Sequence, residues 1–203
     1  MSKQWLYVVA IVAGLVLGGA ALVKYGPVPE GAQVGNRAPE FQAVDLATGD
    51  TITFRDKYDG HVTLINIWAT WCLPCRAEMP AMEELYQAFK DDGFRIAAVS
   101  VDEGRPSDVT AFANELSLNF DILHDRRGAI QQAYLTTGVP ESFLVDRNGI
   151  IVRKQLGEHP WSSPANRRIV AQLLGVSTEA AVGAETPEAG PVASELEIKP
   201  PGA

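Results

Sequence analysis

Two cysteines separated by two residues are the groups best suited to chemistry in this 203-residue chain. Cys72 and Cys75 enclose Leu73 and Pro74, and the sequence holds no other cysteine. An apolar run typical of a buried strand precedes the pair, and a helical pattern follows it. A cysteine at a helix N-terminus has a lowered pKa because it faces free backbone N–H groups and the positive end of the dipole. We therefore predict that Cys72 attacks a partner's sulfur and that Cys75, one turn on and more buried, resolves the mixed disulfide.

The same pair has two other interpretations, a structural disulfide and half of a metal site. A small fold stapled by disulfides needs more cysteines, spread more widely along the chain. A structural zinc site needs two further ligands, and the histidines show no spacing typical of metal sites (His61, His124 and His159). Pro74 suits the first turn of a helix, where the N–H that it lacks has no helical partner. We expect a redox-active disulfide with no cofactor and no metal.

The elements that must position this pair alternate between strands and helices. Strand patterns occupy residues 41–45, 51–54, 62–68, 94–101, 121–123, 142–145 and 150–154, and helical stripes follow Cys72 and cover residues 109–116, 129–134 and 169–174. This alternation predicts an α/β fold with a parallel sheet covered by helices on both sides. The turn signal Asp146-Arg147-Asn148-Gly149 adds a late hairpin and an antiparallel edge.

The segments outside this pattern have distinct compositions. Residues 1–24 contain a stretch of about 19 uncharged residues, which predicts a transmembrane anchor, with a cleaved signal sequence as the alternative. Residues 25–35 are rich in Pro and Gly and read as a linker, residues 36–175 as the folded domain, and residues 176–203 as a disordered acidic Pro/Ala-rich tail. The net charge of −8, with no cluster of Lys and Arg, argues against a nucleic-acid partner.

Two motifs resemble those of a known family. Residues 68–75, WATWCLPC, are similar to the active site of thioredoxin-like proteins, and residues 138–146, GVPESFLVD, are similar to their cis-proline segment. Together they make residues 34–174 resemble the TlpA/ResA/DsbE family of membrane-anchored thiol–disulfide oxidoreductases. The resemblance implies a thioredoxin-like fold with a mixed sheet, an added N-terminal β-hairpin and an inserted helix. It also implies that the domain lies on the periplasmic or extracytoplasmic side of a single-pass inner or plasma membrane anchor.

The resemblance also assigns residues to substrate binding. It implies a cis bond between Val139 and Pro140, packed against the cysteine pair, where backbone pairs with an extended substrate segment. Trp71 and Pro74 belong to the substrate-facing surface around the pair, with pure packing as the alternative for Trp71. Glu141 matches the residue after the cis-proline in the cytochrome-maturation branch, and an exposed glutamate at a strand edge is its alternative.

Glu78 lies three residues after Cys75 on the expected helix. From the residues alone, a solvated glutamate that favours the helix dipole explains it. Thioredoxin has a buried aspartate in the preceding strand, where this chain has Asn66, and an amide does not exchange protons at neutral pH. The resemblance therefore implies that Glu78 gives and takes the proton of Cys75, which completes the catalytic set Cys72, Cys75 and Glu78.

The function expected from this set is reduction of disulfides in exported proteins, in cytochrome c maturation or in assembly of the copper site of a respiratory oxidase. The expected partners are apocytochrome c or an oxidase copper-site protein, and a thiol electron donor in the membrane. One alternative is a periplasmic oxidant that introduces disulfides. Another is a copper chaperone that uses the cysteines and His124. A peroxidase of related fold would carry its cysteine in a Thr-x-x-Cys setting with a preceding Pro, which this sequence lacks.

Overall fold

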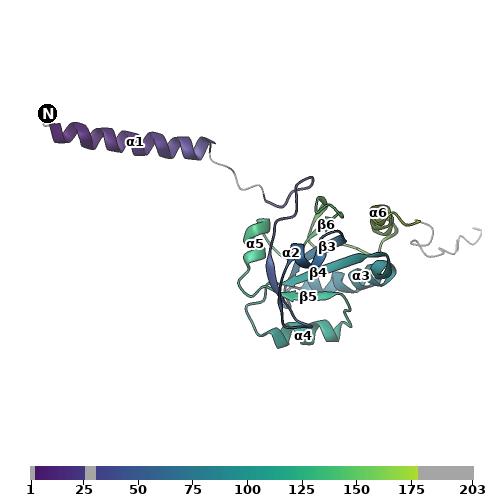
Figure 1. Cartoon of the computed structure of the whole chain (residues 1–203). Coiled ribbons are helices and arrows are strands. Elements are labelled where there is room, and N and C mark those ends of the chain that lie inside the picture. Colours follow the sequence, from purple (N-terminus) through teal and green to yellow (C-terminus); the bar gives the residue numbers. More distant parts are fainter. Residues whose placement is uncertain (1–2, 26–30, 178–203) are drawn as a thin grey trace, which may run out of the picture.

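A seven-stranded mixed sheet forms the centre of the computed structural model, which describes residues 3–25 and 31–177 (Figure 1). The strand order is β2-β1-β5-β4-β3-β6-β7. Strands β3, β4 and β5 are parallel, and the remaining pairs are antiparallel. The strands are β1 (Gln42–Asp45), β2 (Thr51–Thr53), β3 (Val62–Trp68), β4 (Phe94–Ser100), β5 (Asp121–His124), β6 (Glu141–Val145) and β7 (Ile151–Leu156). The predicted α/β class with a mixed, thioredoxin-like sheet is confirmed.

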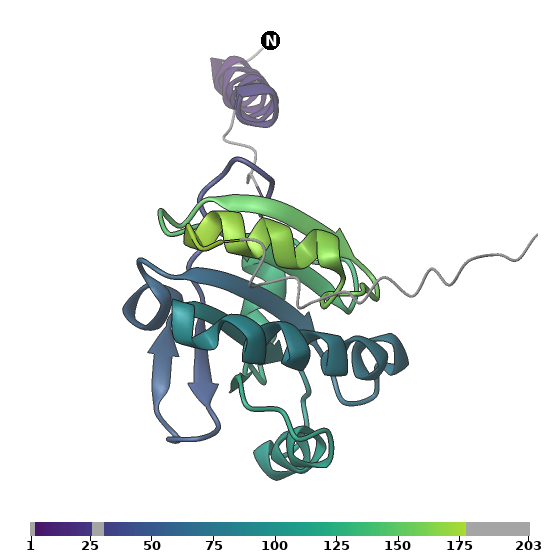
Figure 2. The ribbon, with the colours of Figure 1, turned by 90° about the vertical axis from the view of Figure 1, so that its right-hand side faces the viewer.

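Helices cover both faces of this sheet. They are α2 (Phe54–Tyr58), α3 (Leu73–Phe89), which runs into the 3-10 turn η1 (Lys90–Asp92), α4 (Pro106–Glu115), α5 (Ala129–Tyr134) and α6 (Pro164–Leu174). Helix α1 (Lys3–Tyr25) precedes them in the chain, and none of its described side chains belongs to either core cluster. Helices α3, α4 and α6 share one core cluster, while α2 and α5 share the other. Figure 2 shows α3 and α6 on the same side of the sheet. All seven residues of β3 are buried, as the continuous apolar run predicts for a strand covered on both faces.

Local signals in the sequence explain how α3 begins. Cys72 is the N-cap, and its Sγ accepts the backbone N–H of Cys75 at 3.1 Å. Pro74 lies in the first turn, where a missing N–H is harmless. Pro80 lies inside the helix, which continues through it to Phe89. Four residues, Ala69 to Cys72, join the end of β3 to the start of α3.

Two hairpins match the turn signals. β1 and β2 pair antiparallel around the turn at Gly49, with Ala43 opposite Ile52, and β1 then joins β5. This is the N-terminal hairpin that the resemblance implied. β6 and β7 pair antiparallel on either side of the turn Asp146 to Gly149. The short helix α2 was not predicted, because five residues are too few for a helical period to emerge.

The N-terminal region differs from the expectation. Helix α1 forms, but in the described ranges we find no helix with the length and apolar character that crossing a membrane requires. The prediction of a transmembrane helix in residues 1–24 is therefore not supported.

The residues just before the predicted domain boundary pack on the sheet. Ala32 is buried, and the N–H of Gly35 donates to the carbonyl of Ile151 at 2.8 Å. The contacts of the domain thus begin upstream of residue 36. At the other end α6 stops at Gly175, which caps it in the left-handed conformation. Of the predicted linker and tail, residues 26–30 and 178–203 lie outside the described ranges.

Candidate active site

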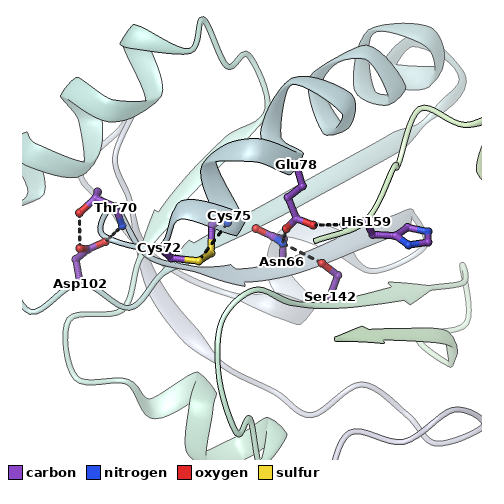
Figure 3. Close-up of a disulfide and its surroundings, with 8 residues drawn as sticks. All are labelled: Asn66, Thr70, Cys72, Cys75, Glu78, Asp102, Ser142 and His159. Atoms are coloured by element: carbon purple, nitrogen blue, oxygen red, sulfur yellow. Dashed lines mark hydrogen bonds between the residues drawn. A yellow bond between two sulfur atoms is a disulfide. The ribbon is translucent and has the colours of Figure 1, made fainter. Parts of the chain in front are cut away.

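Cys72 and Cys75 form a disulfide at the N-terminus of α3, beside the carboxyl end of β3 (Figure 3). Cys72 is 5% exposed and Cys75 is fully buried. Trp71 and Leu73, which flank Cys72, are 70% and 79% exposed. Pro74 is also exposed. The pair therefore lies under a small apolar surface from which a partner's sulfur reaches Cys72 more readily than Cys75.

A buried carboxylate fixes the loop before Cys72. Asp102, which follows β4, accepts the backbone N–H of Thr70 at 2.9 Å and its hydroxyl at 2.7 Å. The hydroxyl of Ser100 donates to the same carboxylate at 2.7 Å. These bonds set the path of the backbone into the cysteine pair. Asp102 was not predicted to belong to the site, although an aspartate directly after a buried strand next to β3 was a signal that could have found it.

His124 is part of the same side of the site. Its side chain is buried, and its Nε2 lies 2.7 Å from the backbone carbonyl of Asp102. One ring nitrogen is thus engaged with the backbone. Among the residues that the structure describes, no three His, Cys, Asp or Glu side chains form a group able to hold a metal ion.

A second polar network lies on the Cys75 side, around Glu78 (Figure 3). One oxygen of Glu78 accepts the amide Nδ2 of Asn66 at 2.8 Å, and the other accepts the backbone N–H of His159 at 3.1 Å. The same Nδ2 donates to the hydroxyl of Ser142 at 2.9 Å. Strand β3 and the segment before α6 therefore contact this carboxylate of α3 directly, and β6 joins the network through Asn66.

Burial dominates the electrostatics of Glu78. Its side chain is only 2% exposed, which excludes the interpretation as a solvated first-turn glutamate. Burial raises the pKa of Glu78 to about 7, and the hydrogen bonds from Asn66 and His159 act in the opposite direction. A carboxyl group with this pKa can both hold and release a proton near neutral pH. Ser142 and His159 were missed by the sequence analysis.

The segment after α5 brings a cis peptide bond to the site. The Val139–Pro140 bond is cis, as the resemblance implied. Val139 packs against the core cluster that contains Cys72 and Cys75. Pro140 is buried, and β6 begins immediately after it, with Glu141 opposite Ile67 of β3. The cis-proline segment therefore lies along the strand that leads to the cysteines.

Glu141 is 1% exposed, so it is not a surface residue at a strand edge. Its Oε1 pairs with Nζ of Lys154 at 2.8 Å. Its Oε2 has no hydrogen-bond partner among the described residues. A side chain in this position does not reach a substrate directly, and the role of Glu141 in substrate binding stays a prediction.

Comparisons with known proteins agree with this arrangement. The model of a family described as the AhpC/TSA family matches residues 34–154, which is more than half of the chain. A thiol-disulfide oxidoreductase ResA from Bacillus thuringiensis subsp. konkukian is 36% identical over 126 residues, which cover 62% of this chain and 71% of the relative. A ResA from Geobacillus kaustophilus is 42% identical over 116 residues, covering 57% and 65%.

A solved structure shares the fold at similar identity. It is the crystal structure of a thiol:disulfide interchange protein DsbE from Chlorobium tepidum, with a TM-score of 0.63 and 31% identity. The match covers 70% of this chain and 99% of that one. The part of the chain that holds the sheet, the disulfide and the cis-proline segment is thus the part shared with these proteins.

Proposed function

The chain belongs to the AhpC/TSA family and is a thiol–disulfide oxidoreductase, and from that premise we propose that it reduces disulfides of exported proteins outside the cytoplasm. Its substrates are apocytochrome c during cytochrome c maturation or the copper-site protein of a respiratory oxidase. A thiol donor in the membrane returns the protein to its dithiol form. The names of the ResA and DsbE relatives support the chemistry, and the buried carboxyl beside the cysteines supports the direction.

The observation that carries this proposal is the burial of Glu78 one helical turn after the buried Cys75. A neutral carboxyl there supplies a proton to Cys75, and a charged one repels a thiolate. Both effects disfavour the thiolate form of the reduced pair. Because a strong oxidant is a protein whose reduced thiolate is stabilised, this arrangement favours a reductant.

The reaction then follows from the positions of the two sulfurs. The Cys72 thiolate attacks one sulfur of the substrate disulfide, and the other substrate sulfur leaves and takes a proton. Cys75 gives its proton to the Glu78 carboxylate and attacks the sulfur of Cys72. The Cys72–Cys75 disulfide forms as the second substrate sulfur leaves and takes a proton from solvent. The substrate is then a dithiol, and two electrons have passed to it. Glu78 then releases its proton to solvent.

Recognition in this proposal uses the surface around Cys72. Trp71, Leu73 and Pro74 offer exposed apolar contact area, and an extended substrate segment lies beside the cis bond at Pro140. Backbone pairing tolerates many side chains, which suits a protein that acts on unfolded or partly folded substrates.

The experiment uses a disulfide-bonded peptide with the Cys-x-x-Cys-His pattern of haem attachment sites. The reduced full chain is expected to reduce it, Cys72→Ser to be inactive, and Cys75→Ser to accumulate a mixed disulfide. Asp91→Asn, an exposed change in η1, serves as the control and should keep full activity. Trapping by Cys72→Ser instead of Cys75→Ser would reverse the assignment of the two cysteines.

A redox equilibrium with glutathione tests the direction. We expect the potential of the Cys72–Cys75 couple to lie nearer to about −270 mV, as in thioredoxin, than to about −120 mV, as in DsbA. A value near the second figure would show that the protein works as an oxidant.

A further inference from the structure

Asn66 holds a buried polar atom that the hydrogen bonds of the oxidised protein leave unused. Its amide nitrogen, Nδ2, donates two hydrogen bonds, one to Glu78 and one to Ser142. Its Oδ1 has no hydrogen-bond partner among the described residues, and the side chain is fully buried. A buried acceptor without a donor is costly, and such an atom in a native fold calls for an explanation.

The position of Asn66 places this oxygen beside the disulfide. Side chains alternate along β3, so Asn66 shares a face with Leu64 and Trp68, and both belong to the core cluster of Cys72 and Cys75. In Figure 3 the amide oxygen of Asn66 lies on the side of the two sulfurs, and the nitrogen lies on the side of Glu78 and Ser142. The hydrogen bond to Glu78, one turn after Cys75, fixes this orientation.

Reduction supplies the donor that the oxidised state lacks. Breaking the Cys72–Cys75 bond takes two electrons and two protons from an incoming dithiol, which becomes a disulfide. One of these protons forms the S–H group of Cys75, and a thiol is a hydrogen-bond donor. We propose that Oδ1 of Asn66 accepts the S–H of reduced Cys75. Asn66 is thus a positioning residue that holds Glu78 with its nitrogen and the reduced thiol with its oxygen.

This role explains the choice of an amide. An aspartate at this position would carry a charge of its own next to Glu78, and two carboxylates in one buried site disfavour each other's ionisation. An asparagine keeps one donor side and one acceptor side at every pH. The inference rests on the redox function of the pair, but it does not depend on which protein is the substrate.

Infrared spectroscopy tests the bond directly. In the Cys72→Ser chain, Cys75 is the only thiol, so its S–H stretching band is assigned without ambiguity. The band should lie below that of a thiol in an apolar solvent and should rise when Asn66→Leu is added. Thr63→Val, a buried polar-to-apolar change elsewhere on β3, is the matched control and should leave the band in place. A band at the frequency of an unbonded thiol in the Cys72→Ser chain would overturn the proposal, even if Asn66→Leu failed to fold.

The glutathione equilibrium gives a second, quantitative readout. It is measured in the Glu78→Gln background, so that a change in the ionisation of Glu78 does not contribute. The Asn66→Leu change removes the acceptor for the thiol. Because one weak hydrogen bond is lost, the equilibrium should shift about two- to fivefold toward the disulfide. A shift toward the dithiol would show that the amide nitrogen faces the sulfur and would overturn the proposal. Because glutathione replaces the natural partner, failure here is distinct from failure to reduce the haem-site peptide.

Discussion

The two buried carboxylates on either side of the disulfide have different roles because different groups donate hydrogen bonds to them. Asp102 on the Cys72 side accepts three protein donors, two from Thr70 and one from Ser100. Glu78 on the Cys75 side accepts one amide N–H and one backbone N–H. Asp102 ties a loop to a neighbouring strand, whereas burial of Glu78 outweighs its hydrogen bonds and raises its pKa to about 7.

Burial alone therefore does not make a carboxylate catalytic. A carboxylate surrounded by donors holds the chain around it in one conformation. A carboxylate with few donors in an apolar site keeps a proton that it can exchange. In this protein the first kind sets the path of the attacking cysteine, and the second kind serves the resolving cysteine in the proposed mechanism.

Removal of Asp102 should give the largest loss of stability. Asp102→Ala leaves the N–H and hydroxyl of Thr70 and the hydroxyl of Ser100 without their acceptor, and we expect a loss of about 3 to 4 kcal/mol in the free energy of unfolding. Urea denaturation at pH 7 measures it. Glu103→Ala removes the exposed carboxylate next in the chain and should change the stability by less than about 0.5 kcal/mol. Equal losses in the two variants would mean that the bonds to Thr70 do not hold the loop.

Glu78→Gln should change the pH dependence of stability. The folded carboxyl has a pKa of about 7 and the unfolded one a value of 4.5, so the folded protein binds the proton more tightly. The stability linked to this proton is fully present below pH 4.5 and is lost as the pH rises through 7. Relative to Glu78→Gln, the wild type should lose on the order of 3 kcal/mol across this window.

Unfolding free energies from urea denaturation between these pH values supply the measurement. Glu84→Gln, an exposed change on the same helix, should follow the wild-type curve. If the curves of wild type and Glu78→Gln ran parallel, Glu78 would not carry the proton, and another group would have to serve Cys75.

The smallest effect is expected at Glu115, an exposed carboxylate that pairs with Arg76 of α3. Arg76 lowers the pKa of Glu115, first through its hydrogen bond and then through its charge, so the contribution is present at neutral pH and lost as the pH falls through the lowered pKa. Exposed pairs are screened by salt. Glu115→Gln should therefore shift the melting temperature only slightly, and only at low salt. A shift as large as that of Asp102→Ala would contradict the contrast between buried and exposed carboxylates.

Local patterns in the sequence predicted much of the fold. The apolar run of β3 and the turn at Asp146 to Gly149 each depend on neighbouring residues, and each appears as expected. Helix α2 was missed because it is a single short turn that starts with a cap at Thr53. The transmembrane prediction used the apolar composition of residues 1–24 alone.

The site was predictable only where its signals are local. The cysteine pair and the cis-proline motif lie in short segments of characteristic sequence. The hydrogen bond from His159 to Glu78 spans 81 positions in the chain, and the hydrogen bond between Asn66 and Ser142 spans 76. No periodicity or spacing reports such contacts, because they arise when strands that are distant in sequence become neighbours.

The central place of β3 has a consequence for how the resolving sulfur becomes accessible. This strand pairs with β4 over its whole length and with β6 over five residues, and it leads into the loop that carries Cys72. We expect its backbone amides to exchange with solvent only when the sheet opens as a whole, since both of its edges are occupied. Cys75 therefore cannot be uncovered by fraying of the strand beneath it. Cys75 must become accessible through local opening of a segment that covers the site, such as the segment around Val139 or the segment around His159.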